Sequence, residues 1–127
     1  MTIRTQQITD MRQDASDRFI EKLMAHFSPL WPREVKTLGA GYRTWIEDGI
    51  ASAATYGIDT QQLSARFINL WFVWGRDFEK QGGFERAAEI LNDSHRTQSV
   101  KVHQLCYRTR IELESFEAER LDRRLVA

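Results

Sequence analysis

The chain has 127 residues, of which 42% are hydrophobic and 11% aromatic, a length that closes one core but not two ordinary domains. Eighteen Lys and Arg balance eighteen Asp and Glu, which removes the electrostatic signature of a nucleic-acid-binding protein. No apolar run reaches the roughly 18 residues that cross a bilayer, and the polar start lacks the apolar stretch of a secretory signal. A single cysteine suits a reducing compartment. These features predict one cytoplasmic domain, residues 1–127, without a nucleic-acid or membrane partner.

The first periodic segment extends over about residues 9–27, after a predicted flexible N-terminus at residues 1–8. Its apolar residues recur at three- and four-residue steps: Ile8, Met11, Ala15, Phe19, Leu23 and Phe27. Pro29 and Pro32 disfavour helical geometry in the residues before them, so we expect this helix to end at Ser28-Pro29-Leu30-Trp31-Pro32. Trp31 lies at this corner, which is expected to be exposed. Because tryptophan is enriched at protein contacts, Trp31 is a candidate partner-binding residue.

The second predicted helix spans about residues 32–56, with a break or kink near Gly39 because two glycines in three residues disfavour a helix. Its end is marked by Tyr56 and Gly57, since glycine adopts the left-handed conformation that closes a helix. Asp59 is then expected to cap the next helix. Only two residues separate the two helices, which predicts a tight hairpin or corner.

A third helix, predicted over about residues 60–74, begins amphipathic and becomes apolar on every side from residue 67 onward. Such a helix is far too short to span a membrane, so it is expected to be buried as the central element. Gly75 is the predicted stop. Asp77 and Phe78 follow in a polar loop, in which Phe78 is the one aromatic anchor.

A short helix at about residues 84–91 and a long one at about residues 97–124 complete the chain. The long helix exceeds what a domain of this size can cover, so residues 118–127 are expected to extend from it. Three of its apolar residues are candidate partner-binding residues, for a second copy or another protein: Phe116, Leu121 and Leu125. Altogether the sequence predicts an all-α, compact single-domain bundle of about five helices with a buried central helix.

No set of residues in the sequence forms a catalytic or metal-binding motif. His103 and Cys106 have the spacing of a metal pair, but no second pair completes a site. As a nucleophile and base, the same two residues lack an identifiable oxyanion donor or orienting acid. Asp77 is either a buried acid or a brace that hydrogen-bonds the backbone or Arg66. We therefore predict a protein that is not an enzyme and has no cofactor and no metal.

One set of residues follows a family-like pattern: Tyr56-Gly57-Ile58, Leu63, Arg66-Phe67-Ile68, Leu70, Phe72-Val73, Gly75, Asp77-Phe78-Glu79 and Ala87-Ala88-Glu89-Ile90-Leu91. Over about residues 31–105 the chain thereby resembles small helical proteins encoded beside type VI secretion effectors. It departs from their pattern at Trp74, where a smaller aliphatic residue is usual, and at residues 81–83, which lengthen the loop.

The resemblance implies a protein-binding accessory role. The leading hypothesis is a chaperone or adaptor that binds a type VI effector or a component of the secretion spike. The alternative is an immunity protein that neutralises a cognate secreted toxin. A strong single-sign surface patch would favour this alternative, and the balanced net charge is evidence against it. An enzyme acting through Asp77 or through His103 and Cys106 is the third and least supported hypothesis.

Overall fold

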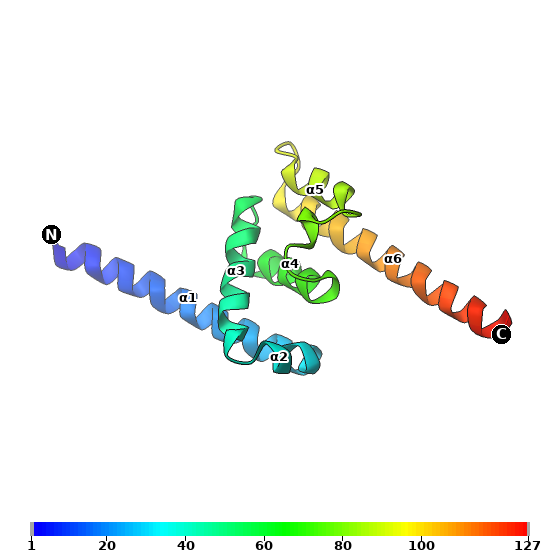
Figure 1. Cartoon of the computed structure of the whole chain (residues 1–127). Helices are drawn as coiled ribbons and strands as arrows, with labels where there is room; N and C mark the ends of the chain where they lie inside the picture. Colours follow the sequence, from blue (N-terminus) through cyan, green and yellow to red (C-terminus); the bar gives the residue numbers. More distant parts are fainter. Residues whose placement is uncertain (1, 127) are drawn as a thin grey trace.

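The computed structural model describes the backbone of residues 2–126 and the side chains of residues 15–118. Within this part the fold is all-α, as predicted, with six α-helices and two 3₁₀ turns (Figure 1). The elements are α1 (Thr2–Leu30), α2 (Pro32–Leu38), η1 (Gly39–Gly41), α3 (Tyr42–Thr55), α4 (Gln61–Trp74), η2 (Phe78–Lys80), α5 (Glu85–Asn92) and α6 (Gln98–Val126). Figure 1 shows the far ends of α1 and α6 extending away from the remaining helices toward opposite sides of the view.

The first helix begins earlier than its sequence predicts and ends within the predicted segment at residues 28–32. It begins at Thr2 rather than near Thr9, and it continues through Pro29 to Leu30. Proline is tolerated here because it stands one residue from the helix end, where its missing amide removes a single hydrogen bond. The amide of Trp31, two residues after Pro29, still donates to the Phe27 carbonyl at 2.8 Å. The predicted flexibility of residues 1–8 stays a prediction, since their side chains lie outside the described part.

The predicted second helix is divided, which raises the helix count above the expected five. The break falls at η1, where Gly39 has φ of 53°, so the kink expected at this glycine is confirmed. Beyond it, α3 packs closely against α4 at Gly49. A Cβ atom built on Gly49 would lie 2.8 Å from Cγ1 of Ile68, a distance too short for two carbon atoms. Glycine at this position therefore sets how closely the two helices approach.

The turn after α3 has the predicted geometry. Gly57 has φ of 79° and its amide donates to the Ala54 carbonyl at 3.0 Å, while the Ile58 amide donates to the Ala53 carbonyl at 3.0 Å. This pair of bonds is a Schellman motif, which satisfies carbonyls left open at a helix end. Ile58 and Ala53 are both fully buried, so the turn also contributes to the core.

The cap of α4 is Thr60, and the prediction that Asp59 would cap it is wrong. The Thr60 hydroxyl accepts a hydrogen bond from the Leu63 amide at 3.3 Å. Asp59 instead pairs with Gln98 at the start of α6, whose side-chain amide donates to the carboxylate and whose oxygen accepts from the Asp59 amide, both at 2.9 Å. A residue 39 positions away in the sequence thus occupies the polar groups that a local cap would have used.

The central helix is α4, as predicted, and no residue from Phe67 to Trp74 is exposed. It joins two apolar clusters. One contains Phe67, Leu70 and Trp71 together with Ala53, Ile58, Phe78, Ile90, Leu91, Val102 and Leu105. The other contains Ile68 and Phe72 together with Ile20, Leu23, Phe27, Tyr42 and Ile46. The helix ends at Gly75, which has φ of 105° and donates its amide to the Trp71 carbonyl, so the predicted stop is confirmed.

Candidate protein-contact surface

The loop after α4 is held by an aromatic anchor and a braced aspartate. Phe78 is 2% exposed, which confirms it as the anchor. Asp77 adopts the left-handed conformation and forms ion pairs with Arg76 at 3.6 Å and with Lys80 at 3.7 Å. Asp77 is therefore a brace rather than a buried acid. Its basic partners, Arg76 and Lys80, belong to its own loop, whereas the sequence suggested Arg66.

The buried acid of this loop is Glu79, which the sequence does not single out. Glu79 is 3% exposed, and its Oε1 atom accepts hydrogen bonds from the Tyr56 hydroxyl at 3.1 Å and from the Ser52 hydroxyl at 3.4 Å. Burial and the adjacent Glu79 carboxylate raise the pKa of Tyr56 to about 12. The Oε2 atom of Glu79 has no hydrogen-bond partner among the described residues.

A buried lysine completes this polar cluster. Lys101 on α6 is 7% exposed, and its Nζ atom donates to the backbone carbonyl of Tyr56 at 2.9 Å. Tyr56 therefore contacts η2 through its hydroxyl and α6 through its carbonyl. The cluster therefore fixes the start of α6 and the loop onto the end of α3.

His103 and Cys106, the possible base and nucleophile, lie in different environments. His103 is exposed, whereas Cys106 is half-buried beside the core. Cys106 instead shares a hollow of about 220 Å³ with His26 and Arg66. Burial raises the pKa of the Cys106 thiol and Arg66 lowers it by less, so the neutral thiol is favoured over the nucleophilic thiolate. Among the described residues, no group of three His, Cys, Asp or Glu could hold a metal ion.

An apolar hollow of about 310 Å³ lies between α2 and α4. Its floor contains Trp45, Trp71 and Phe72, and Arg76 stands at its edge, stacked 5.7 Å from the centre of the Trp71 ring. Arg76 is also paired with Asp48 at 2.8 Å. The polar residues that line the hollow are Arg33, Glu34 and Thr37 of α2, together with Arg76.

Trp31 takes part in the core more than the sequence predicts. The turn around it is exposed, as expected, but the ring is only half-exposed and stacks on Phe72 with an interplanar angle of 8°. Its indole nitrogen donates to the side-chain oxygen of Asn69 at 3.0 Å. The exposure expected of this turn is therefore confirmed, while the proposed role of Trp31 as a partner contact remains a prediction.

Among the described residues, the large apolar side chains that are exposed lie on α6, except for Leu30 at the end of α1. Every residue from Arg110 to Ala118 is exposed. At three- and four-residue steps, Thr109, Leu113 and Phe116 continue the face that packs into the core through Val102 and Leu105; we call these three residues the inner row. Leu113 is 41% exposed and Phe116 is 57% exposed.

A second set of exposed apolar residues lies on roughly the opposite side of α6, given 3.6 residues per helical turn. It consists of Val100, Tyr107 and Ile111, which are 42%, 53% and 45% exposed, and we call it the outer row. The guanidinium of Arg110 lies 6.0 Å from the centre of the Tyr107 ring. The two rows give one projecting helix two separate apolar faces.

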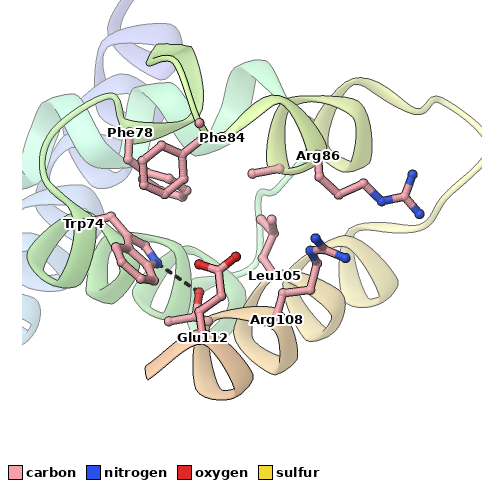
Figure 2. Close-up of a pocket in the computed structure, with 10 residues that line it drawn as sticks. Trp74, Phe78, Phe84, Arg86, Leu105, Arg108 and Glu112 are labelled. Carbon is pink, nitrogen blue, oxygen red and sulfur yellow. Dashed lines mark hydrogen bonds between the residues drawn. The ribbon is translucent and has the colours of Figure 1, made fainter. Parts of the chain in front are cut away.

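Figure 2 shows the place where α6 leaves the body, a small hollow between α5 and α6. Trp74 and Phe84 line it, and the Trp74 indole nitrogen donates to the Thr109 hydroxyl at 3.0 Å. Arg108 also lines the hollow and has no ion pair among the described side chains. The volume of this hollow, about 50 Å³, is far below the roughly 300 Å³ of the smallest typical small-molecule sites.

The other two candidate contact residues, Leu121 and Leu125, lie outside the residues whose side chains the structure describes. In the part of the chain that was searched, no helix is both long and apolar enough to cross a bilayer. No protein-family model, no curated protein and no solved structure matches the chain. The geometry of the surface therefore carries the functional argument.

Proposed function

We propose that this protein is a non-enzymatic accessory factor that binds another protein, as a chaperone or adaptor for a type VI secretion effector. The observation that carries the binding role is the exposed segment of α6 at residues 110–118. It presents Ile111, Leu113 and Phe116 to solvent. Leu113 and Phe116 lie on one face of the helix and Ile111 on the other, and exposed apolar patches mark interaction sites more often than ordinary surface does.

The energetics of the segment also favour a partner. The exposed stretch continues a helix whose first part packs into the core, so it has no nucleation cost, but among the described residues only local interactions stabilise it. Its one ion pair among the described residues, Arg110 with Glu114 at 3.9 Å, contributes only about 0.3 kcal/mol. A partner that buries the apolar rows would stabilise this part of α6 by far more than the ion pair does.

The assignment to a secretion effector rests on the resemblance. The residues that carry it are structural in this fold: Gly57 forms the turn after α3, Gly75 ends α4 and Phe78 anchors the loop. These residues therefore support a helical body of the kind found in the proteins that the chain resembles, and the contact surface is formed by other residues. We assign the effector contact to the outer row, where Tyr107 and Ile111 lie on the side of α6 away from the core.

Co-purification from the native cell tests this proposal. The tagged full chain is compared with a Tyr107→Glu/Ile111→Glu variant, and captured proteins are quantified by mass spectrometry. A Thr44→Glu/Ala51→Glu variant is the matched control, since it adds the same charges at exposed positions of α3. We expect a secreted effector or a spike component to be enriched by the wild type and the control but not by the outer-row variant.

Two results would overturn the proposal. Absence of any effector or spike component from the wild-type capture would remove the adaptor role. Capture of a toxin whose activity is abolished in the complex would identify an immunity protein instead.

A further inference from the structure

We propose that Trp74 is a positioning residue for the contact surface, because its hydrogen bond to Thr109 sets the direction in which α6 leaves the body. This role rests on the proposed function, in which a partner binds the outer row. The contacts of α6 with the core end at this place. Val102 and Leu105 are 0% and 3% exposed, Thr109 on the same face is half-buried, and every residue from Arg110 to Ala118 is exposed.

The bond from Trp74 is the most C-terminal hydrogen bond that joins the described part of α6 to another element. The indole nitrogen of Trp74, at the end of α4, donates to the Thr109 hydroxyl at 3.0 Å, across 35 residues of sequence (Figure 2). An indole has one donor, and this bond uses it. The bond therefore acts on α6 at the point beyond which the core no longer supports the helix.

The Trp74 ring is itself held by other aromatic rings. Its centroid lies 5.5 Å from that of Phe84, with the two planes at 64°. Phe84 contacts Phe78 in a similar edge-on manner, with centroids 5.4 Å apart, and Phe78 is 2% exposed. Edge-to-face ring pairs have a preferred geometry, so the direction of the Trp74 N–H group is fixed by the core of the body.

A second set of attachments lies near the beginning of α6. Gln98 exchanges two hydrogen bonds of 2.9 Å with Asp59. The Lys101 ammonium donates to the Tyr56 carbonyl at 2.9 Å. At 1.5 Å per residue, Lys101 and Thr109 are roughly 12 Å apart along the helix axis. Attachments at this separation determine the direction of a helix, whereas the first set alone leaves the exit of α6 free to tilt.

The outer row lies at the same level of α6 as the Trp74 bond, but on the other side. Tyr107 and Ile111 each stand two residues from Thr109, which places both about 160° from it around the helix. Trp74 therefore holds the outer row from behind, where a partner on that row does not reach it. A surface held in one direction binds more tightly, because less of the binding energy is lost in ordering it.

Distances between two spin labels measure the direction of α6 in the isolated chain. The labels are attached in a Cys106→Ser background, which removes the single native cysteine. One label is at Ala51→Cys on α3 and the other at Ser115→Cys on α6, both at exposed positions. The width of the distance distribution then reports how firmly the exposed part of α6 is held relative to the body.

Four variants separate the hydrogen bond from ordinary packing. Trp74→Phe and Thr109→Val each remove one partner of the bond, and we expect both to broaden the distribution to the same extent. The double variant should broaden it no further, since the same bond is lost. Thr109→Ser keeps the hydroxyl and should keep the wild-type distribution. Thr44→Val is the matched control, because it makes the same change at an exposed position of α3.

Capture from the native cell tests the consequence for binding. Trp74→Phe and Thr109→Val should weaken capture of the partner roughly threefold to tenfold, the effect of losing one hydrogen bond that orders the surface. Thr109→Ser and Thr44→Val should capture as the wild type does. A wild type that captures no effector or spike component contradicts the proposed function, whereas the spin-label distances decide the role of Trp74 in either case.

Three results would overturn the positioning role. The first is an unchanged distance distribution in both Trp74→Phe and Thr109→Val. The second is a distribution in Thr109→Ser as broad as that in Thr109→Val, which would assign the effect to the lost methyl group. The third is undiminished capture by variants whose distributions are broad.

Discussion

The hydroxyl of Tyr56 donates a hydrogen bond of 3.1 Å to the buried carboxylate of Glu79, and this contact fastens the loop after α4 to the end of α3. The carbonyl of the same tyrosine accepts the Lys101 ammonium at 2.9 Å. Three segments that are distant in the sequence therefore meet at one residue. Its substitution is expected to affect stability rather than binding, because none of these groups faces the rows of α6.

Tyr56→Phe is expected to lower the free energy of unfolding by about 1 to 2 kcal/mol at neutral pH. The substitution keeps the ring but removes the closest donor to a carboxylate that stays buried. Urea denaturation of both proteins measures the difference. An unchanged urea midpoint would show that Ser52 or solvent already satisfies Glu79.

The same variant should change the pH dependence at alkaline pH. The folded protein holds the Tyr56 proton up to a pKa of about 12, above the ordinary value of 10, so between these values the unfolded state binds fewer protons. The stabilisation from Tyr56 is therefore complete below pH 10 and is lost as the pH rises to 12. The stability advantage of the wild type over Tyr56→Phe should shrink across that window in urea titrations. A constant difference would contradict the raised pKa.

The helix contact at Gly49 gives a signed pair of predictions. Gly49→Ala should destabilise the protein by about 1 to 3 kcal/mol, because the added methyl group overlaps the buried Ile68 side chain and outweighs the gain in helix propensity. Gly41→Ala is the matched control, since no atom lies within 4 Å of its added carbon and its φ of −82° suits alanine. It should be neutral or stabilising by up to about 1 kcal/mol. Thermal midpoints that move in the same direction for both variants would argue against the close approach of α3 and α4.

Features that depend on neighbouring residues could be predicted from the sequence. The turn at Gly57, the stop at Gly75 and the burial of α4 each follow from a few adjacent residues and are confirmed. The cap of α4 could not be predicted, because Asp59 is drawn to Gln98, a contact that exists only after α6 has docked. Glu79 was missed for the same reason: a charged residue in a polar loop gives no sign of a distant tyrosine.

The contact surface was predicted in part. The surplus length of the last helix marks α6 as projecting, and the structure confirms exposure as far as Ala118. The division into two apolar rows could not be predicted, because it depends on where the core ends at Thr109. At Pro29 the local signal located the end of α1 correctly, since one residue of the helix follows this proline.

Removing the ring should have very different effects on stability at two phenylalanines. Phe67→Ala removes a fully buried ring and should lower the free energy of unfolding by about 3 to 5 kcal/mol. Phe116→Ala should change it by less than about 0.5 kcal/mol when measured at concentrations that keep the chain monomeric. Chemical denaturation over a dilution series distinguishes the two. A large loss for Phe116→Ala in the monomer would mean that the inner row packs within its own chain.

Deleting residues 119–127 should leave the thermal midpoint of the isolated chain nearly unchanged while weakening partner binding. The physical reason is that residues 110–118 are already exposed, so the described core ends before the deletion begins. The deleted end carries Leu121 and Leu125, and their loss reduces the apolar area that a partner can bury. Differential scanning calorimetry of the isolated chain, with quantitative capture of the partner from the native cell, separates the two effects. If the truncated chain alone unfolds at a much lower temperature, the end of α6 packs on its own body, and the contact surface must lie elsewhere.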